Sequence, residues 1–507
     1  MAAYSQNNKR IAKNTLLLYV RMLMMMAVSL YTSRIVLDAL GVVDYGIYNV
    51  VGGVVTLFSF LNGTMSAATQ RFLSYAIGKG DEKLLQDTFS QTLVVHVLIA
   101  LVIIFLAEAL GYKFVVGGLT IPEQRLSSAV WVFHFSLLSL AFTIVQMPYT
   151  AMIIAQERMS AFAYFSIIEA LMKLSVAFSL QWLAVDKLRL YGLLLCAVSV
   201  STMLLYSFYC RFRFKAKSRW IWNSVLLKNL LGFAGWNLSA HIALVARTQG
   251  VNILLNLFFG PALNAARGIA VQVSGALSSF VNNFQLAVGP QLVKSYAQGD
   301  MDGMRQLAYS STKMSFLLVS MLVLPVYLEC GTVLALWLKD VPGYALLFTR
   351  LVLVSMLVDA LSGTLGYSAI ATGNIKGYQL SLSSLFLLNP LLVYLLFKFG
   401  FQPEVAYWVE IVFNMMALCD RLLFLRHLIG LSVRRYLKSV FVPCVLLLLM
   451  SVFVLYSIRQ AMETSLLRLL ALVLSSIVSV TGLGYLIVLD KSERLHVNNL
   501  VKRILYK

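Results

Sequence analysis

The sequence predicts an all-α, polytopic integral membrane protein with about fourteen membrane-spanning helices. Apolar residues make up 60% of the 507 positions and charged residues only 12%, whereas an average soluble domain carries roughly 25% charged residues. Apolar stretches of about 20 residues recur from one end of the chain to the other, and each is long enough to cross the hydrocarbon core as a helix. Backbone groups in lipid must bond within their own segment, so these spans are expected to form a helical bundle.

The first span is too long, and too charged at its far end, for a cleaved signal peptide. No connection between spans is long enough to form a domain; the longest is 211–227. The expected spans are 14–39, 46–74, 87–110, 127–154, 160–184, 189–210, 228–258, 263–294, 305–330, 343–371, 377–397, 404–425, 436–457 and 465–489. We therefore expect an N-terminal lobe at 1–210, a cytoplasmic linker at 211–227, a C-terminal lobe at 228–430, and two further helices with a basic tail at 431–507.

Local patterns occur twice along the chain, at nearly one offset. The matched pairs are 74–81 with 295–302, 148–151 with 366–369, Asn62 with Asn283, and Gln70 with Gln291. Transporters are often built from two similar bundles with the substrate site at their interface. We therefore expect helices one to six to superpose on helices seven to twelve.

The positive charge is distributed unevenly over the predicted loops. With the N-terminus inside, 27 lysines and arginines fall on the inner side and seven on the outer side. Cytoplasmic loops carry the excess of basic residues in membrane proteins, so both termini are expected in the cytoplasm. The basic run at 211–219 then serves as a topology signal and a contact for anionic membrane lipids. Nucleic acid is not expected as a partner, because the chain offers no soluble platform for it.

Several spans contain charged residues, and a charge at the centre of a bilayer costs at least about 2.5–3.5 kcal/mol. Glu169 and Lys173 are four residues apart on one helix face and should neutralise each other. Arg34 and Asp38 share the same spacing near the outer end of the first span. Arg21 has no acid one turn away, so it either snorkels to the inner interface or faces a water-filled cavity.

Small and polar residues form a stripe on the second span and on the eighth, its expected repeat mate. Such stripes also serve as helix-packing seams, but two equivalent helices with the same stripe favour a shared hydrophilic cavity. The residues are Asn49, Gly52, Thr56, Ser59, Gly63, Ser66 and Gln70 on the second span, and Arg267, Ser274, Ser278, Asn282 and Gln285 on the eighth. The seventh span carries Arg247, with Gln249, Asn252 and Asn256 on another of its faces.

Two lone acids, Asp359 and Glu410, lie in the tenth and twelfth spans. Each either binds a coupling cation or proton, or pairs with an interior arginine. Once the two expected ion pairs cancel, Arg21, Arg247 and Arg267 remain against these two acids. A cavity that leans cationic suits an anionic headgroup such as a pyrophosphate, which arginine binds with forked contacts.

No enzyme, cofactor or metal site is expected from the sequence. There is no P-loop and no GxSxG motif, and the five cysteines are scattered without CxxC spacing. His96, His134 and His241 lie inside spans, where a hydrogen-bonded interior histidine is the simpler interpretation and a proton relay the alternative.

Three segments of the N-terminal region resemble bacterial polysaccharide flippases of the O-antigen type. These are 14–21, 31–41 and 44–53, and the segment 70–75 followed by Gly78 fits the same pattern. Those flippases belong to the multidrug/oligosaccharidyl-lipid/polysaccharide exporter superfamily. The most specific part is Leu40-Gly41-x-x-Asp44-Tyr45-Gly46, and the resemblance extends over essentially the whole chain.

The resemblance implies a transporter that flips undecaprenyl-pyrophosphate-linked oligosaccharide across the bacterial inner membrane by alternating access. In related flippases, arginines on the first, seventh and eighth helices line the central cavity; the matching positions are Arg21 or Arg34, Arg247 and Arg267. Asn252 and Asn282 are further candidate ligands, and other membrane proteins of polysaccharide assembly are candidate partners. Two alternatives remain: a multidrug or small-metabolite antiporter, which would rely on Asp359 or Glu410, and a non-transporting membrane protein of glycan assembly.

Overall fold

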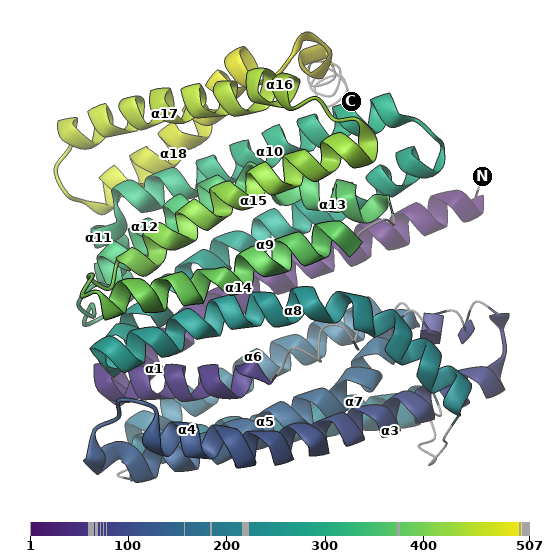
Figure 1. Ribbon diagram of the computed structural model, residues 1–507, viewed down its shortest axis with the longest axis vertical. Coiled ribbons are helices and arrows are strands. Elements are labelled where there is room, and N and C mark those ends of the chain that lie inside the picture. Colours follow the sequence, from purple (N-terminus) through teal and green to yellow (C-terminus); the bar gives the residue numbers. More distant parts are fainter. Residues whose placement is uncertain are drawn as a thin grey trace. The chain divides into compact units, whose positions relative to one another are not determined.

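The computed structural model describes residues 2–58, 65, 69, 70, 72–74, 76, 77, 79–156, 158–182, 185–214, 223–372, 376–495 and 498; within these ranges, side chains are described except at 2–21, 225–227, 229–241, 283, 286, 287, 289–291, 293, 294 and 297. Every regular element in this part of the chain is a helix (Figure 1). Among the described residues, 11 helices are long and apolar enough to cross a membrane. The predicted all-α, polytopic membrane fold is confirmed.

The chain divides into two compact units. The first comprises Met1–Gly268 with Trp337–Gly343, and the second comprises Ile269–Leu336 with Tyr344–Lys507. The boundary between the units follows Gly268, within the eighth predicted span at 263–294. The seventh predicted span, which follows the linker at 211–227, therefore belongs to the first unit. The lobe boundaries expected from the sequence stay a prediction.

The first unit is organised around one long central helix, α5, which packs on α1, α3 and α7. Val132, Phe133 and Leu137 of α5 are fully or almost fully buried in its core. The unit contains α1 (Ala2–Leu57), α3 (Glu82–Leu106), η1 (Ala107–Gly111), α4 (Tyr112–Gly117), α5 (Glu123–Ala155), α6 (Met159–Trp182), α7 (Lys187–Phe214), α8 (Ser224–Phe259) and the first turns of α9 (Pro261–Ala297).

A kink at Gly41 separates the first two predicted spans, which the structure joins in α1. The φ of Gly41 is 76° and its ψ is 170°. This backbone conformation is open to glycine and strained for other residues. The glycine of the Leu40-Gly41-x-x-Asp44-Tyr45-Gly46 stretch therefore redirects the chain at that point.

The second unit begins in α9 and ends with the two helices that follow the predicted C-terminal lobe. It contains the rest of α9, then α10 (Met301–Leu328), most of α11 (Cys330–Trp337), α12 (Ala345–Ala360), α13 (Gly363–Ala371), α14 (Lys376–Lys398), α15 (Val405–Ile429), α16 (Val433–Tyr436), η2 (Leu437–Phe441), α17 (Val442–Ala461), α18 (Leu466–Leu483) and η3 (Gly484–Val488). The predicted span 343–371 is interrupted between α12 and α13. The side chains of Tyr436 and Arg421 bind the carbonyl of Leu361 and the hydroxyl of Ser362 at this break.

The repeated segments 74–81 and 295–302 form the same kind of turn in the two units. The residues that correspond in this turn differ from those that the sequence comparison had paired. Gly80 and Gly299 have φ values of 68° and 73°, and each is followed by an aspartate that caps the next helix. Asp81 accepts from the amide of Leu84, and Asp300 accepts from the amide of Gly303. Because a left-handed glycine and a capping aspartate define the turn, Asp81 corresponds to Asp300, whereas the sequence pairing had matched it with Asp302.

A candidate anion site on the α8–α9 hairpin

Helices α8 and α9 form a tight hairpin at Gly260. The φ of Gly260 is 84°, and its amide donates to the Asn256 carbonyl at 2.8 Å. Further along the hairpin, Asn264 donates to the side chain of Asn252 at 2.9 Å. One turn beyond, the Arg267 guanidinium donates to the Thr248 carbonyl at 3.1 Å.

This register brings Arg267 beside the residue that follows Arg247. Both side chains are buried, with 8% of Arg247 and 7% of Arg267 exposed. The Thr248 carbonyl is a neutral acceptor, and this hydrogen bond orients the Arg267 guanidinium across the hairpin. The hairpin therefore carries two buried arginines, and their role in binding an anion stays a prediction.

Asn252 lies where the hairpin packs on α1. Its amide donates to the Asn49 carbonyl at 3.2 Å, and a Cβ added at Gly53 would come within 2.6 Å of its Nδ2 atom. A Cβ at Gly46 would lie only 1.9 Å from the Pro261 carbonyl oxygen. Asn49 is the one stripe residue at this contact, whereas Gly46 and Gly53 lie outside the stripe. At Asn49 the helices pack closely, which was the alternative weighed for the stripe.

Arg34 lies on α1 just before the kink and lines a pocket of about 60 Å³. Asp38, its expected partner, forms an ion pair with Lys339 at 3.1 Å. Ligand pockets measure roughly 300–1,000 Å³, so this pocket is too small for an oligosaccharide headgroup. The pocket is lined by Arg34, Leu37, Asp38, Gly41, Val42, Lys339 and Asp340.

The remaining candidate residues are not gathered at the hairpin. The side chain of Arg21 lies outside those that the structure describes. Asn282 is exposed on the part of α9 that belongs to the second unit, and Glu410 is half-buried on α15.

Asp359 lies at the end of α12, where its carboxylate is 3.6 Å from the Arg421 guanidinium. The sequence placed Arg421 at a cytoplasmic helix end, but only 12% of its side chain is exposed. At the α12–α13 break, Arg421 also donates to the Ser362 hydroxyl, a contact that the sequence analysis did not anticipate.

The Glu169–Lys173 pair is confirmed. The lysine Nζ atom lies 2.6 Å from a carboxylate oxygen of Glu169. These two interior charges neutralise each other within α6, as their spacing predicted.

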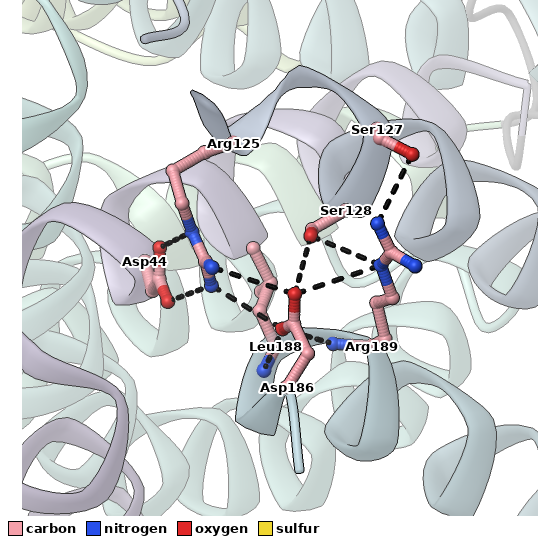
Figure 2. A network of polar contacts seen from close by, with 7 residues as sticks. All are labelled: Asp44, Arg125, Ser127, Ser128, Asp186, Leu188 and Arg189. Atoms are coloured by element: carbon pink, nitrogen blue, oxygen red, sulfur yellow. Dashed lines mark hydrogen bonds and ion pairs between the residues drawn. The ribbon is translucent and has the colours of Figure 1, made fainter. Parts of the chain in front are cut away.

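A network of charged residues that sequence reasoning missed ties together α1, α5 and α7 (Figure 2). Arg125, at the start of α5, binds both carboxylate oxygens of Asp44 on α1, with an Nε–Oδ1 distance of 2.7 Å. It also lies 3.3 Å from Asp186, before α7. Ser128 donates to Asp186 at 2.6 Å, and Arg189 lies 3.5 Å away. Asp44 in the family-like stretch was the one sequence signal for this network.

The pKa of Asp186 reports the balance of forces in the network. Burial raises this pKa, but hydrogen bonds from Ser128 and the Arg189 amide lower it, together with the charges of Arg125 and Arg189. The stabilising contacts outweigh burial, so the pKa of Asp186 lies below its usual value. The network therefore favours the ionised carboxylate.

The final helices of the second unit are held by buried ion pairs that the sequence did not reveal. Glu329, at the end of α10, lies 2.9 Å from Arg468 on α18 and 3.2 Å from Arg459 on α17. Lys313 of α10 is 2% exposed and lies 2.9 Å from Glu493, beyond α18. Among the described residues, no group of three or more His, Cys, Asp and Glu side chains could hold a metal ion.

Comparison with known proteins gives three kinds of match. The MatE family model matches residues 13–179. The uncharacterized membrane protein EpsK of Bacillus subtilis (strain 168) is 20% identical over 315 residues, which cover 61% of this chain and 62% of EpsK. The alignment thus spans less than two thirds of that relative.

Solved structures with a similar fold include the lipid II flippase MurJ in an inward closed conformation. Its TM-score is 0.70 at 11% identity, over 94% of this chain and 98% of that one. A MATE in complex with MaD3S has a TM-score of 0.58 at 15% identity, over 82% and 96% of the two chains. A transporter from Pyrococcus furiosus has a TM-score of 0.59 at 14% identity, over 82% and 96%.

The 11 apolar helices define a polytopic membrane protein, and its fold is similar to that of solved membrane transporters. The match to the MatE family model lies in the N-terminal third of the sequence, and the likeness to these solved structures lies in the fold.

Proposed function

We propose that this transporter flips an undecaprenyl-pyrophosphate-linked oligosaccharide, the repeat unit of a surface polysaccharide, across the bacterial inner membrane by alternating access. Both termini would be cytoplasmic. The observation that carries the proposal is the pair of buried guanidinium groups, Arg247 and Arg267, on one hairpin.

The chemistry of this pair suits a pyrophosphate. A guanidinium presents five N–H donors in a rigid fork that matches phosphate oxygens. Both charges are largely removed from water, where an ionic contact is stronger than at an exposed site. A cationic drug would be repelled by the same two groups. The positive charge of the two arginines therefore favours an anionic lipid headgroup over a cationic drug as the substrate.

The extent of the fold match supports the same choice. The lipid II flippase structure covers 94% of this chain, whereas the two other transporters described above each cover 82%. In the Pyrococcus furiosus transporter, reverse polarity of the binding pocket suggests a different function. Pocket polarity is thus a property by which functions within this superfamily are told apart.

The test is surface glycan in a deletion strain complemented with variants of this chain. Arg247→Ala with Arg267→Ala should abolish export while protein level and membrane insertion stay normal. Lysine at the same positions should restore export only in part, because it lacks the fork. The matched control is Lys173→Ala, which removes an interior cation that Glu169 already neutralises. Normal export by the double alanine variant would contradict the proposal.

One observation favours a second candidate, a cation-coupled antiporter for drugs or small metabolites. Asp359 is 57% exposed and lies beside a buried arginine at a helix break, where a proton or cation could bind in place of the ion pair. Asp359→Asn should then abolish drug resistance conferred by the protein, while the double arginine variant keeps it. Normal surface glycan in Asp359→Asn, together with its loss in the double arginine variant, supports the flippase.

A further inference from the structure

We propose that the surface around Glu108 and His134, on η1 and α5, binds the primary ammonium headgroup of a membrane phospholipid such as phosphatidylethanolamine. This site is separate from the α8–α9 hairpin. It does not depend on which substrate the transporter carries.

The carboxylate of Glu108 and the imidazole of His134 form a direct contact. The Oε1–Nδ1 distance is 2.9 Å, and 40% and 34% of the two side chains are exposed. One contact leaves an ionised carboxylate with capacity for further hydrogen-bond donors. An ammonium group carries such donors and also the opposite charge.

A local irregularity of the helix places Glu108 opposite His134. Residues Ala107–Gly111 form a π-helical turn between α3 and α4, and such turns recur at functional sites. Gly111 packs tightly on α5, because a Cβ there would come within 3.0 Å of the Phe133 ring. The close approach of the two helices brings the acid within reach of the histidine.

Aromatic rings surround the pair. Tyr112 stacks on His134 with a centroid distance of 5.9 Å and an interplanar angle of 19°, and Trp131 meets the same ring edge-on at 6.5 Å. Tyr112 and Trp131 are 40% and 48% exposed. The faces of such rings attract cations, and amine ligands are commonly recognised in this way.

The neighbouring surface is apolar and exposed, as expected of a face in contact with lipid. Phe105 and Leu110 are 72% and 64% exposed, and Leu101 and Leu138 are 57% and 42% exposed. An acid on such a face is costly unless a partner neutralises it. Lys113, which the charge pattern places outside, follows five residues after Glu108, and exposed tryptophan and tyrosine mark the headgroup level. The molecule available there is a phospholipid.

The Glu108 carboxylate and the aromatic rings together favour one kind of phospholipid headgroup over others. The Glu108 carboxylate repels an anionic headgroup such as that of phosphatidylglycerol. A choline headgroup is attracted to the rings but has no N–H to donate to the acid. A primary ammonium satisfies both the carboxylate and the rings, and charge-assisted hydrogen bonds of this kind are the stronger ones.

The test is native mass spectrometry of the full-length purified protein in mixed micelles of phosphatidylethanolamine, phosphatidylcholine and phosphatidylglycerol. The wild-type protein should retain ethanolamine lipid over the other two, and Glu108→Gln should lower that preference about fivefold. Trp131→Leu keeps the acid and should lower it by a smaller factor. The matched control is Glu169→Gln, which removes a carboxylate already paired within α6 and should leave the preference unchanged.

Three results would overturn the proposal. They are equal retention of all three lipids by the wild type, an unchanged preference in both Glu108→Gln and Trp131→Leu, and loss of the preference in the Glu169 control. If Glu108→Gln fails to fold, Trp131→Leu alone decides the matter. A homodimer that forms through this face without bound lipid would also contradict it.

Discussion

Arg125 and Arg267 both place a guanidinium inside the first unit, but the groups described above as orienting them differ in charge. Arg125 binds two carboxylates, Asp44 and Asp186, at the ends of three helices. Arg267 is more deeply buried, and the group that orients it across the hairpin is a neutral backbone carbonyl. A carboxylate cancels a positive charge, whereas a carbonyl only directs it. The first arrangement holds helices together, and we propose that the second positions a guanidinium for an anion.

The segment of α1 that follows Gly41 connects these two regions. Asp44 anchors it to Arg125, and five residues later Asn49 accepts a hydrogen bond from Asn252 of the hairpin. Between them, Gly46 lets the backbone approach Pro261. The two regions can therefore be perturbed separately by changing one contact of α1 at a time.

The largest loss of stability is expected for Gly46→Ala. A Cβ at this position meets the Pro261 carbonyl oxygen at 1.9 Å, a clash that requires backbone movement and costs at least about 3 kcal/mol. Thermal unfolding in detergent measures the loss. Gly52→Ala is the matched control, because nothing lies within 4 Å of its added Cβ and alanine favours the helix. Equal stability of the two variants would mean that the hairpin does not pack on α1 as described.

Arg125→Ala is expected to cause the second largest loss, about 2–3 kcal/mol of the free energy of unfolding. It removes the guanidinium that binds both oxygens of Asp44 and leaves Asp186 with Arg189, and breaking a largely buried ion pair is destabilising. Arg189→Ala removes a cation that is 43% exposed at the edge of the same network and should cost less than about 1 kcal/mol. If both substitutions have the same small effect, the network is a surface feature without a role in holding the helices.

A smaller effect is expected from pH, through Asp186. Its pKa is lowered in the folded protein, so the carboxylate contributes stability above its ordinary pKa. That contribution is lost as the pH falls through the lowered value, because the unfolded chain then binds the proton first. The thermal midpoint of the wild type should fall more steeply between about pH 5 and about pH 3 than that of Asp186→Asn. Parallel curves would show that the carboxylate is not stabilised by the network.

Much of the fold could be predicted from the sequence, because apolar length and charge pattern set where helices cross a membrane. The Glu169–Lys173 pair was predictable for the same reason, since i, i+4 neighbours are determined by helix geometry. Contacts between distant helices were not. Nothing in the local sequence indicates that Lys313 meets Glu493, or that Arg125 meets Asp44 and Asp186.

The sequence indicated which residues to consider for the candidate site, but it indicated their spatial arrangement only in part. Arg247 and Arg267 were found from their depth in apolar spans, and the structure places them on one hairpin. Asn252 was chosen by the same reasoning but lies in a packing seam. Residue type alone does not distinguish a residue that packs two helices together from one that lines a cavity, because small and polar residues occur in both.

The central claim is that Arg247 and Arg267 recognise the pyrophosphate of a lipid-linked oligosaccharide. Its most direct test is binding of an undecaprenyl-pyrophosphate-linked oligosaccharide to the purified wild-type protein, Arg267→Lys and Arg267→Ala in detergent. We expect affinity to fall from arginine to lysine to alanine, with a loss of at least about tenfold for alanine, because the forked charge-assisted contact is removed. Unchanged affinity in Arg267→Ala, and in its combination with Arg247→Ala, would contradict the account.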